Sequence, residues 1–77
     1  RLSSRFVKLI RDGLFELRIS VKGNIYRLFF IFDEGDVVIL LNGFQKKTQK
    51  TPRKEIDKAL KIKEMYYADK QSQDRGL

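Results

Sequence analysis

Apolar and polar residues alternate along the first half of the chain in a way that predicts three β-strands. From Phe15 to Val21 every second residue is apolar and the residues between are polar, which is the period of a half-buried strand. Two further runs, at 25–32 and 37–44, are rich in aromatic and β-branched residues and predict two more strands. Gly23-Asn24 and the polar stretch 33–36 suit tight turns. The chain therefore predicts a three-stranded antiparallel meander.

The two turns place the same residues on one face of this meander. With Gly23 and Asn24 as the first turn and Glu34 and Gly35 as the second, the facing pairs are Val21 with Tyr26, Ile19 with Leu28, Leu17 with Phe30, Phe32 with Val37, Phe30 with Ile39 and Leu28 with Leu41. All these residues are apolar or aromatic, so we expect this face, Tyr26 included, to form the core.

The opposite face is half polar and half apolar. It combines Arg18, Ser20, Arg27 and Asn42 with Phe29, Ile31, Val38 and Leu40. Arg27 is expected opposite Ser20 on one side and Asn42 on the other. One C-terminal helix cannot cover both faces of a sheet, so the pattern indicates missing structure or an obligate partner.

The ends of the chain carry weaker signals. Residues 1–12 have no sustained period and suit a short helical turn or a covering loop. Further on, Thr51 is the expected N-cap of a helix, with Pro52 in its first position and Glu55 in its first turn. The expected buried stripe of this helix is Ile56, Ala59, Leu60 and Tyr67. We expect the helix to end near Asp69 and 71–77 to be a flexible tail, in a single α+β domain spanning 1–77.

The composition excludes most familiar active sites. The 77 residues include neither His nor Cys, which leaves no thiolate nucleophile, no sulfur-ligated zinc and no imidazole base. The net charge of +7, from 17 basic and 10 acidic residues, favours an anionic partner, although many soluble domains are basic without one. No apolar run is long enough to span a bilayer, so we expect a soluble, cytoplasmic protein with no membrane partner.

Basic residues provide the candidate chemistry. Lys46, Lys47 and Lys50 lie between a strand end and a helix start, where they suit a phosphate backbone, whereas Lys58, Lys61 and Lys63 are expected on a solvated helix face. Arg18 and Arg27 share a sheet face with Glu16, so they either pair with this carboxylate or bind phosphate. Glu16 is the one candidate base on that face. Tyr66 and Tyr67 suit the core, a stacking platform for a base, or a partner contact.

Three segments resemble a known family when they are taken in order. GLFELRIS, GNIYRLFFIFDEGD and ILLNGFQKKTQKTPRKEIDKA resemble the HigB-like branch of the RelE/ParE toxin superfamily, over roughly residues 13–67. The resemblance implies a RelE-like fold whose N-terminal strand and helical hairpin are mostly absent from this chain. It thereby predicts an N-terminal truncation or a companion fragment that supplies the rest.

The resemblance also implies a function and a set of site residues. It implies a toxin that cleaves mRNA on the ribosome without a metal ion or a cofactor and is inhibited by a cognate antitoxin of helix-turn-helix type. The catalytic candidates are Arg27, Lys47, Arg18 and Glu16, and the RNA-binding candidates are Lys46, Lys50, Arg53 and Lys54. Glu16 stands where better-known ribosome-dependent members have a lysine. Two alternatives stay open: a ParE-type toxin that acts on DNA gyrase, and a non-catalytic remnant that binds only antitoxin or nucleic acid.

Overall fold

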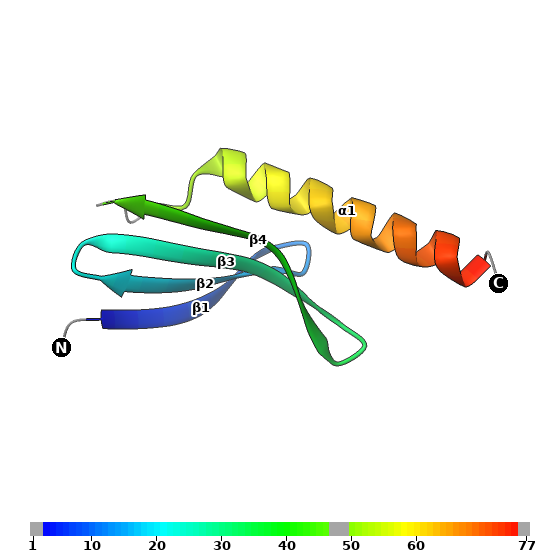
Figure 1. Ribbon diagram of the computed structural model, residues 1–77, viewed down its shortest axis with the longest axis horizontal. Helices are drawn as coiled ribbons and strands as arrows, with labels where there is room; N and C mark the ends of the chain where they lie inside the picture. The colour runs from blue at the N-terminus through cyan, green and yellow to red at the C-terminus, as the bar shows by residue number, and fades with distance from the viewer. Residues whose placement is uncertain (1–2, 47–49, 76–77) are drawn as a thin grey trace.

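Four antiparallel strands and one long helix make up the part of the chain that the structure describes (Figure 1). The computed structural model describes residues 3–46 and 50–75. The strands are β1 (Ser3–Arg11), β2 (Leu14–Val21), β3 (Asn24–Asp33) and β4 (Asp36–Lys46), in the sheet order β1-β2-β3-β4, and the helix is α1 (Arg53–Arg75). The predicted α+β fold of a meander and a C-terminal helix is confirmed, with four strands in place of three.

The additional strand is β1, where a helical turn or a loop was expected. A tight turn at Asp12 and Gly13, with φ values of 52° and 76°, folds β1 back onto β2. Phe6 then lies opposite Arg18, and Lys8 lies opposite Glu16. The sequence pattern did not predict this strand because its apolar residues come in adjacent pairs, at 6–7 and 9–10, which interrupts the alternation.

The turn between β2 and β3 lies one residue earlier than predicted. Lys22 and Gly23 form it, with φ values of 49° and 82°, the left-handed conformation at both central positions that a type I′ hairpin requires. Each residue of β2 therefore faces a residue two positions earlier on β3 than expected, and Ile19 pairs with Tyr26. A shift of two positions leaves every side chain on its predicted face.

The pairing of β3 with β4 follows the prediction only near its turn. Phe32 faces Val37 and Phe30 faces Ile39, as expected. A β-bulge between Phe29 and Phe30 then shifts the register by one residue. The bulge places Arg27 opposite Gly43, and the earlier β2–β3 turn places it opposite Arg18, so the prediction that it faces Ser20 and Asn42 is wrong.

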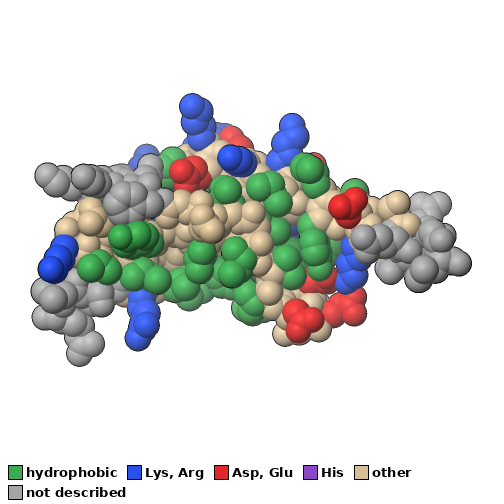
Figure 2. All heavy atoms as spheres, viewed as in Figure 1, with side chains coloured by type: hydrophobic (Ala, Val, Ile, Leu, Met, Phe, Trp, Pro, Cys, Tyr) green, Lys and Arg blue, Asp and Glu red, His purple; other side chains and the backbone are tan. Residues whose placement is uncertain are grey.

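The helix covers the mixed face of the sheet, so the prediction of which face is the core was wrong. The buried core consists of Leu14, Phe29, Ile31 and Ala59, with Ile10, Val38, Leu40, Leu41, Ile56, Leu60 and Tyr66 packed against it. The all-apolar face is open: Tyr26 is 44% exposed, Phe32 54% and Ile39 56%. Figure 2 shows hydrophobic side chains at the surface along the strands. The mixed face can be buried because its charged groups pair with one another, as described below.

Contacts with the β3–β4 hairpin extend α1 beyond its predicted end. The Tyr66 hydroxyl donates to Asp33 at 2.6 Å, and the Lys70 ammonium donates to Asp33 at 2.7 Å and also to Glu34. The helix thus continues past Asp69 to Arg75, and most of the expected flexible tail is helical. Tyr67 is 36% exposed, so the buried stripe of the helix includes Tyr66 in its place.

Candidate functional site

A buried cluster of charged side chains lies between the sheet and the start of α1. Glu16 and Arg18 come from β2 and Arg27 from β3, and all three are buried. The Glu16 carboxylate accepts a hydrogen bond from Arg27 Nε at 2.8 Å and one from Arg18 Nη2 at 3.3 Å. Of the two roles left open for these arginines, pairing with Glu16 is the one that the structure shows.

Thr51 closes this cluster from the helix side. Its hydroxyl donates to Glu16, at 2.9 and 3.0 Å from the two carboxylate oxygens, and accepts a hydrogen bond from Arg18 Nη2 at 2.7 Å. Arg27 Nη2 donates to the Lys50 carbonyl at 3.0 Å. These contacts fix the segment that leads into α1 above the two arginines.

The position of Thr51 corrects the predicted start of the helix. The Pro52 carbonyl accepts the first backbone bonds, from Glu55 at 3.1 Å and Ile56 at 3.3 Å, so Pro52 is the N-cap and Thr51 precedes it. Nothing in the sequence distinguished a capping hydroxyl from one that binds a buried carboxylate across the sheet. Thr51 is thus a site residue that sequence reasoning missed.

The cluster carries an excess of positive charge. Two guanidinium groups face one carboxylate, so the three buried side chains Glu16, Arg18 and Arg27 sum to +1. Within the described part of the chain Arg18 Nε is buried and makes no hydrogen bond, while the Phe6 ring lies 4.8 Å from the Arg18 guanidinium carbon. A buried excess charge of this kind favours an anion nearby.

Exposed cations surround the start of α1. Lys50, Arg53 and Lys54 are exposed there, and Lys54 also lines a hollow of about 370 Å³ with Asn42 and Lys58. Lys46 ends β4, but its side chain lies outside the described residues, as does all of Lys47. The RNA-binding candidates of the described chain thus lie next to the buried cluster.

The predicted catalytic roles depend on access to the cluster. Glu16 has no exposed surface and is held by Arg18, Arg27 and Thr51, so it could receive a proton from a substrate only if the segment 50–52 moved away. The assignment of Arg27, Lys47, Arg18 and Glu16 as catalytic residues therefore stays a prediction.

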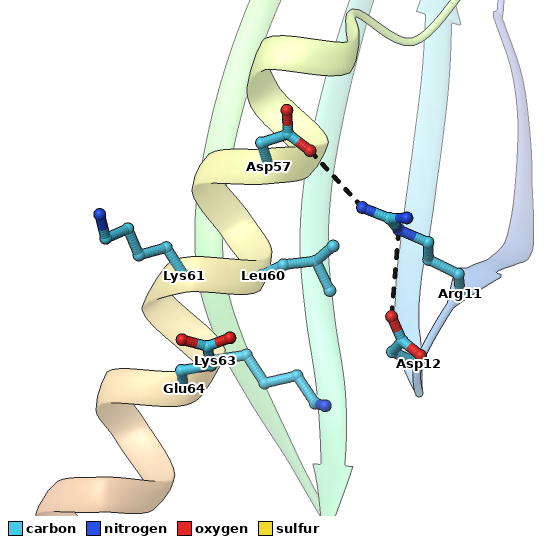
Figure 3. A pocket seen from close by; sticks show the side chains of 7 residues that line it. All are labelled: Arg11, Asp12, Asp57, Leu60, Lys61, Lys63 and Glu64. Carbon is cyan, nitrogen blue, oxygen red and sulfur yellow. Dashed lines mark ion pairs between the residues drawn. The ribbon is translucent and has the colours of Figure 1, made fainter.

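A larger hollow, of about 530 Å³, lies on the other side of α1 near the β1–β2 turn (Figure 3). Arg11 pairs there with Asp57 at 3.5 Å and with Asp12 at 4.0 Å. Its charged lining residues comprise three basic ones, Arg11, Lys61 and Lys63, and three acidic ones, Asp12, Asp57 and Glu64. Because these charges balance, this hollow does not favour an anion as the cluster does.

The two tyrosines of α1 have different surroundings. Tyr66 packs against the core and binds Asp33, whose pKa is lowered by the hydrogen bond from Lys70 and then by that from Tyr66. The hydrogen bond to Asp33 raises the pKa of Tyr66. Tyr67 is exposed, with the Lys63 ammonium 5.8 Å from its ring centre. Of the two, Tyr67 is the one whose ring is available to a base or a partner.

A family comparison covers the cluster and the whole sheet. The family model of phage-derived Gp49-like proteins (DUF891) matches residues 1–64. The chain belongs to the Gp49-like family. This family is related to the RelE/HigB-type toxins of toxin–antitoxin systems. No curated protein and no solved structure matches this Gp49-like protein.

Two further observations concern the described residues of this Gp49-like protein. No group of three or more Asp or Glu side chains lies close enough together in 3–46 and 50–75 to hold a metal ion. In the same part of the chain no helix combines the length and the apolar character needed to cross a membrane.

Proposed function

We propose that this Gp49-like protein is the toxin of a toxin–antitoxin pair and that it cleaves mRNA on the ribosome without a metal ion. The buried excess charge of Glu16, Arg18 and Arg27, placed beneath exposed cations at the start of α1, carries the proposal. Phosphate is the anion that such an arrangement suits, because guanidinium and ammonium groups bind it through charge-assisted hydrogen bonds. The antitoxin, expected to be of helix-turn-helix type, would prevent access to these cations.

The proposed reaction is attack of a ribose 2′-hydroxyl on the adjacent phosphate. The 2′-hydroxyl gives up its proton to water as a new P–O bond forms to the 2′-oxygen, the bond to the 5′-oxygen breaks, and the leaving 5′-oxygen takes a proton from water. Negative charge builds up on the phosphate in the transition state, where fixed positive charges lower the barrier. Lys47 would supply this charge directly, and Lys46, Lys50, Arg53 and Lys54 would bind flanking phosphates.

We assign Arg18, Arg27 and Glu16 a positioning role in this reaction. They lie beneath Thr51 and the Lys50 carbonyl, and through these contacts they hold residues 50–51, at the start of the basic segment 50–54, over the sheet. The arginines also add a buried positive field below the segment, which does not require them to touch the RNA. Holding the reacting groups in the correct geometry lowers the activation free energy substantially, which matters most in a reaction without a strong general base.

Primer extension on a reporter mRNA tests the proposal, with and without translating ribosomes, after expression of the protein in cells. We expect cuts only in translated message. Lys50→Ala and Lys54→Ala should weaken cleavage at least tenfold together, since each removes a contact worth about 1 kcal/mol or more to a phosphate. Lys61→Ala, on the exposed side of the same helix, is the matched control and should cut normally.

The other outcomes separate the alternative functions. Growth arrest without cuts would point to a ParE-type target such as DNA gyrase. Neither arrest nor cuts would leave a binding protein without catalysis. Cuts that do not depend on Lys50 and Lys54 would retain the nuclease but place its RNA elsewhere.

A further inference from the structure

One exposed aromatic ring lies on the side of the sheet that carries the buried cluster. The other exposed large apolar side chains of the described strands lie on the all-apolar face turned away from α1, and they are Val7, Leu9, Tyr26, Phe32, Val37 and Ile39. Phe6 differs from them because it lies opposite Arg18 in the β1–β2 pairing, which puts it on the helix side. It is 45% exposed there.

The buried arginine Arg18 supports the Phe6 ring. Its guanidinium carbon lies 4.8 Å from the ring centre, while Glu16 and Thr51 fix the guanidinium from the other side. Arg18 is 6% exposed, and its Nε is buried without a hydrogen bond among the described residues, so electron-rich groups near it are favoured. A ring held in this way is pre-organised, so a flat group that stacks on it loses little conformational entropy.

Exposed cations from two elements lie near this ring. Lys8 is two residues from Phe6 on the same face of β1, which is roughly 7 Å along the strand, and it is exposed. Thr51 accepts a hydrogen bond from Arg18 Nη2 at 2.7 Å, which brings its exposed neighbour Lys50 to the same cluster. The ring therefore lies between cations of β1 and cations of the segment that leads into α1.

A single ring among cations suits an unpaired nucleic-acid base. Proteins that bind single strands combine cations, which bind the phosphates, with aromatic rings, on which the bases stack. A small anion would use the cations and not the ring. A protein partner would bury a wider apolar patch, whereas the other exposed apolar side chains of the described strands lie on the opposite face.

We propose that Phe6 is the platform on which one base of a single-stranded RNA stacks. The base packs on the exposed part of the ring, Arg18 supports the ring from below, and Lys8 binds a flanking phosphate. The inference rests on the proposed function for RNA as the ligand, and it adds a residue that recognises the base to those that bind its phosphates. Because every base has a π-face, the contact tolerates different sequences.

Tryptophan fluorescence tests the stack directly. The chain contains no tryptophan, so Phe6→Trp places a single reporter at the site. We expect a short oligoadenylate to quench most of its emission, because a stacked base is in contact with the indole ring. A ribose-phosphate backbone of the same length without bases should not quench it, although it carries the same charge. Phe32→Trp, at a 54% exposed position on the all-apolar face, is the matched control and should keep its emission.

The affinity for the same oligoadenylate gives a second measurement. Phe6→Leu keeps an apolar side chain over Arg18 but removes the π-face, so binding measured by fluorescence anisotropy should weaken on the order of tenfold. The slope of log K against log salt concentration should stay the same, because no phosphate contact is lost. Phe32→Leu makes the same change on the other face and should bind normally. Urea denaturation checks that both leucine variants remain folded.

Several results would overturn the stack. One is quenching of Phe6→Trp by the backbone without bases, and another is an affinity that Phe6→Leu leaves unchanged. Loss of antitoxin inhibition in Phe6→Leu with unchanged RNA affinity would assign the ring to a protein partner instead.

Neither measurement requires cleavage, so this inference and the proposed function can fail separately. A chain that stacks RNA on Phe6 without cutting mRNA keeps the inference and loses the nuclease. Cuts that persist in Phe6→Leu, together with an unchanged affinity, keep the nuclease and exclude the stack.

Discussion

Glu16 is the residue on which the buried cluster depends most. Arg18 and Arg27 lie directly opposite each other on neighbouring strands, and like charges in such a pair destabilise a sheet unless a counter-charge lies between them. Glu16→Ala would leave two buried guanidinium groups without that counter-charge. We expect a loss of about 3–5 kcal/mol in the free energy of unfolding, measured by urea denaturation. Glu64→Ala, at an exposed position, should cost about 0.5 kcal/mol or less.

Thr51 offers a milder test of the same cluster. Thr51→Val keeps the shape of the side chain but removes the hydroxyl that joins Glu16 to Arg18. We expect a loss of about 1–3 kcal/mol in the free energy of unfolding, because buried polar groups lose a partner. Thr51→Ser retains the hydroxyl and should recover most of this loss. Equal stability of the two variants would mean that the hydroxyl contributes nothing.

The sequence allowed one half of this cluster to be predicted and not the other. Glu16 and Arg18 are two residues apart on a strand, so alternation alone puts them on one face. Arg27 joins them through a hairpin whose faces could be inferred from parity. Thr51 is 35 residues from Glu16, and a Thr-Pro pair before a helix is equally typical of a cap. Contacts at such separations depend on how the helix docks, which no local pattern reports.

At the scale of elements, the contact between α1 and the β3–β4 hairpin makes stability depend on pH. Hydrogen bonds from Lys70 and Tyr66 lower the pKa of Asp33 below its ordinary value of 3.8. Asp33 therefore stabilises the fold above that pH, and its contribution is lost as the pH falls through its lowered pKa. Asp33 in turn raises the pKa of Lys70 above 10.5 and that of Tyr66 above 10.0. Their contributions are complete below these values and are lost as the pH rises through the raised pKa values.

Urea midpoints measured across pH test this contact with the Asp33→Asn variant. The variant should be less stable than the natural chain near neutral pH, and the difference should shrink both in strong acid and in strong alkali. Asp69→Asn, an exposed change on the same helix, should show no such profile. A difference that is constant with pH would mean that ionisation of Asp33 does not contribute.

The β2–β3 turn gives a second prediction at this scale. Lys22 has a φ of 49°, a conformation that asparagine tolerates better than lysine. Lys22→Asn should therefore stabilise the chain by a few tenths of a kcal/mol, and Gly23→Ala, at a φ of 82°, should destabilise it by about 1 kcal/mol. Thermal unfolding measures both. A destabilising Lys22→Asn, or a Gly23→Ala that leaves the melting temperature unchanged or raises it, would contradict the type I′ assignment.

These elements also show why most residues of the strands were assigned to the correct face of the sheet although the core face was not. Leu41 is an exception, because the β3–β4 bulge places it opposite Phe29 and against the core instead of opposite Leu28. Parity of the turns assigned Phe29 and Ile31 to one face and Phe30 and Phe32 to the other, and both assignments hold. The choice of core face relied on counting apolar residues, which favoured the side of Phe32. The helix binds the other side because its leading segment is held by Glu16 and Arg27 and because Ala59 lets it approach Phe29 closely. The face that the helix covers was thus determined by the paired charges and not by the number of apolar residues on each face.

At the scale of the whole molecule, the two sides of the sheet differ in what they can bind. The net charge of +7 leaves an excess of cations on the helix side, and among the described side chains of the strands only Arg5 is a charged group on the all-apolar face turned away from α1. Long-range attraction of a polyanion therefore acts on the side of α1.

The salt dependence of RNA binding tests this division of surfaces. For single-stranded nucleic acid, each phosphate contact contributes about 0.7 to the slope of log K against log salt concentration. The combined change of Lys50, Arg53 and Lys54 to alanine should therefore reduce the slope by about 2, measured by fluorescence anisotropy with a short labelled RNA. Lys61→Ala with Lys63→Ala, in the hollow of balanced charge, is the matched control and should leave the slope nearly unchanged. If the control reduced the slope as much as the triple variant, the binding would follow net charge alone, and the start of α1 would not be the site where RNA phosphates dock.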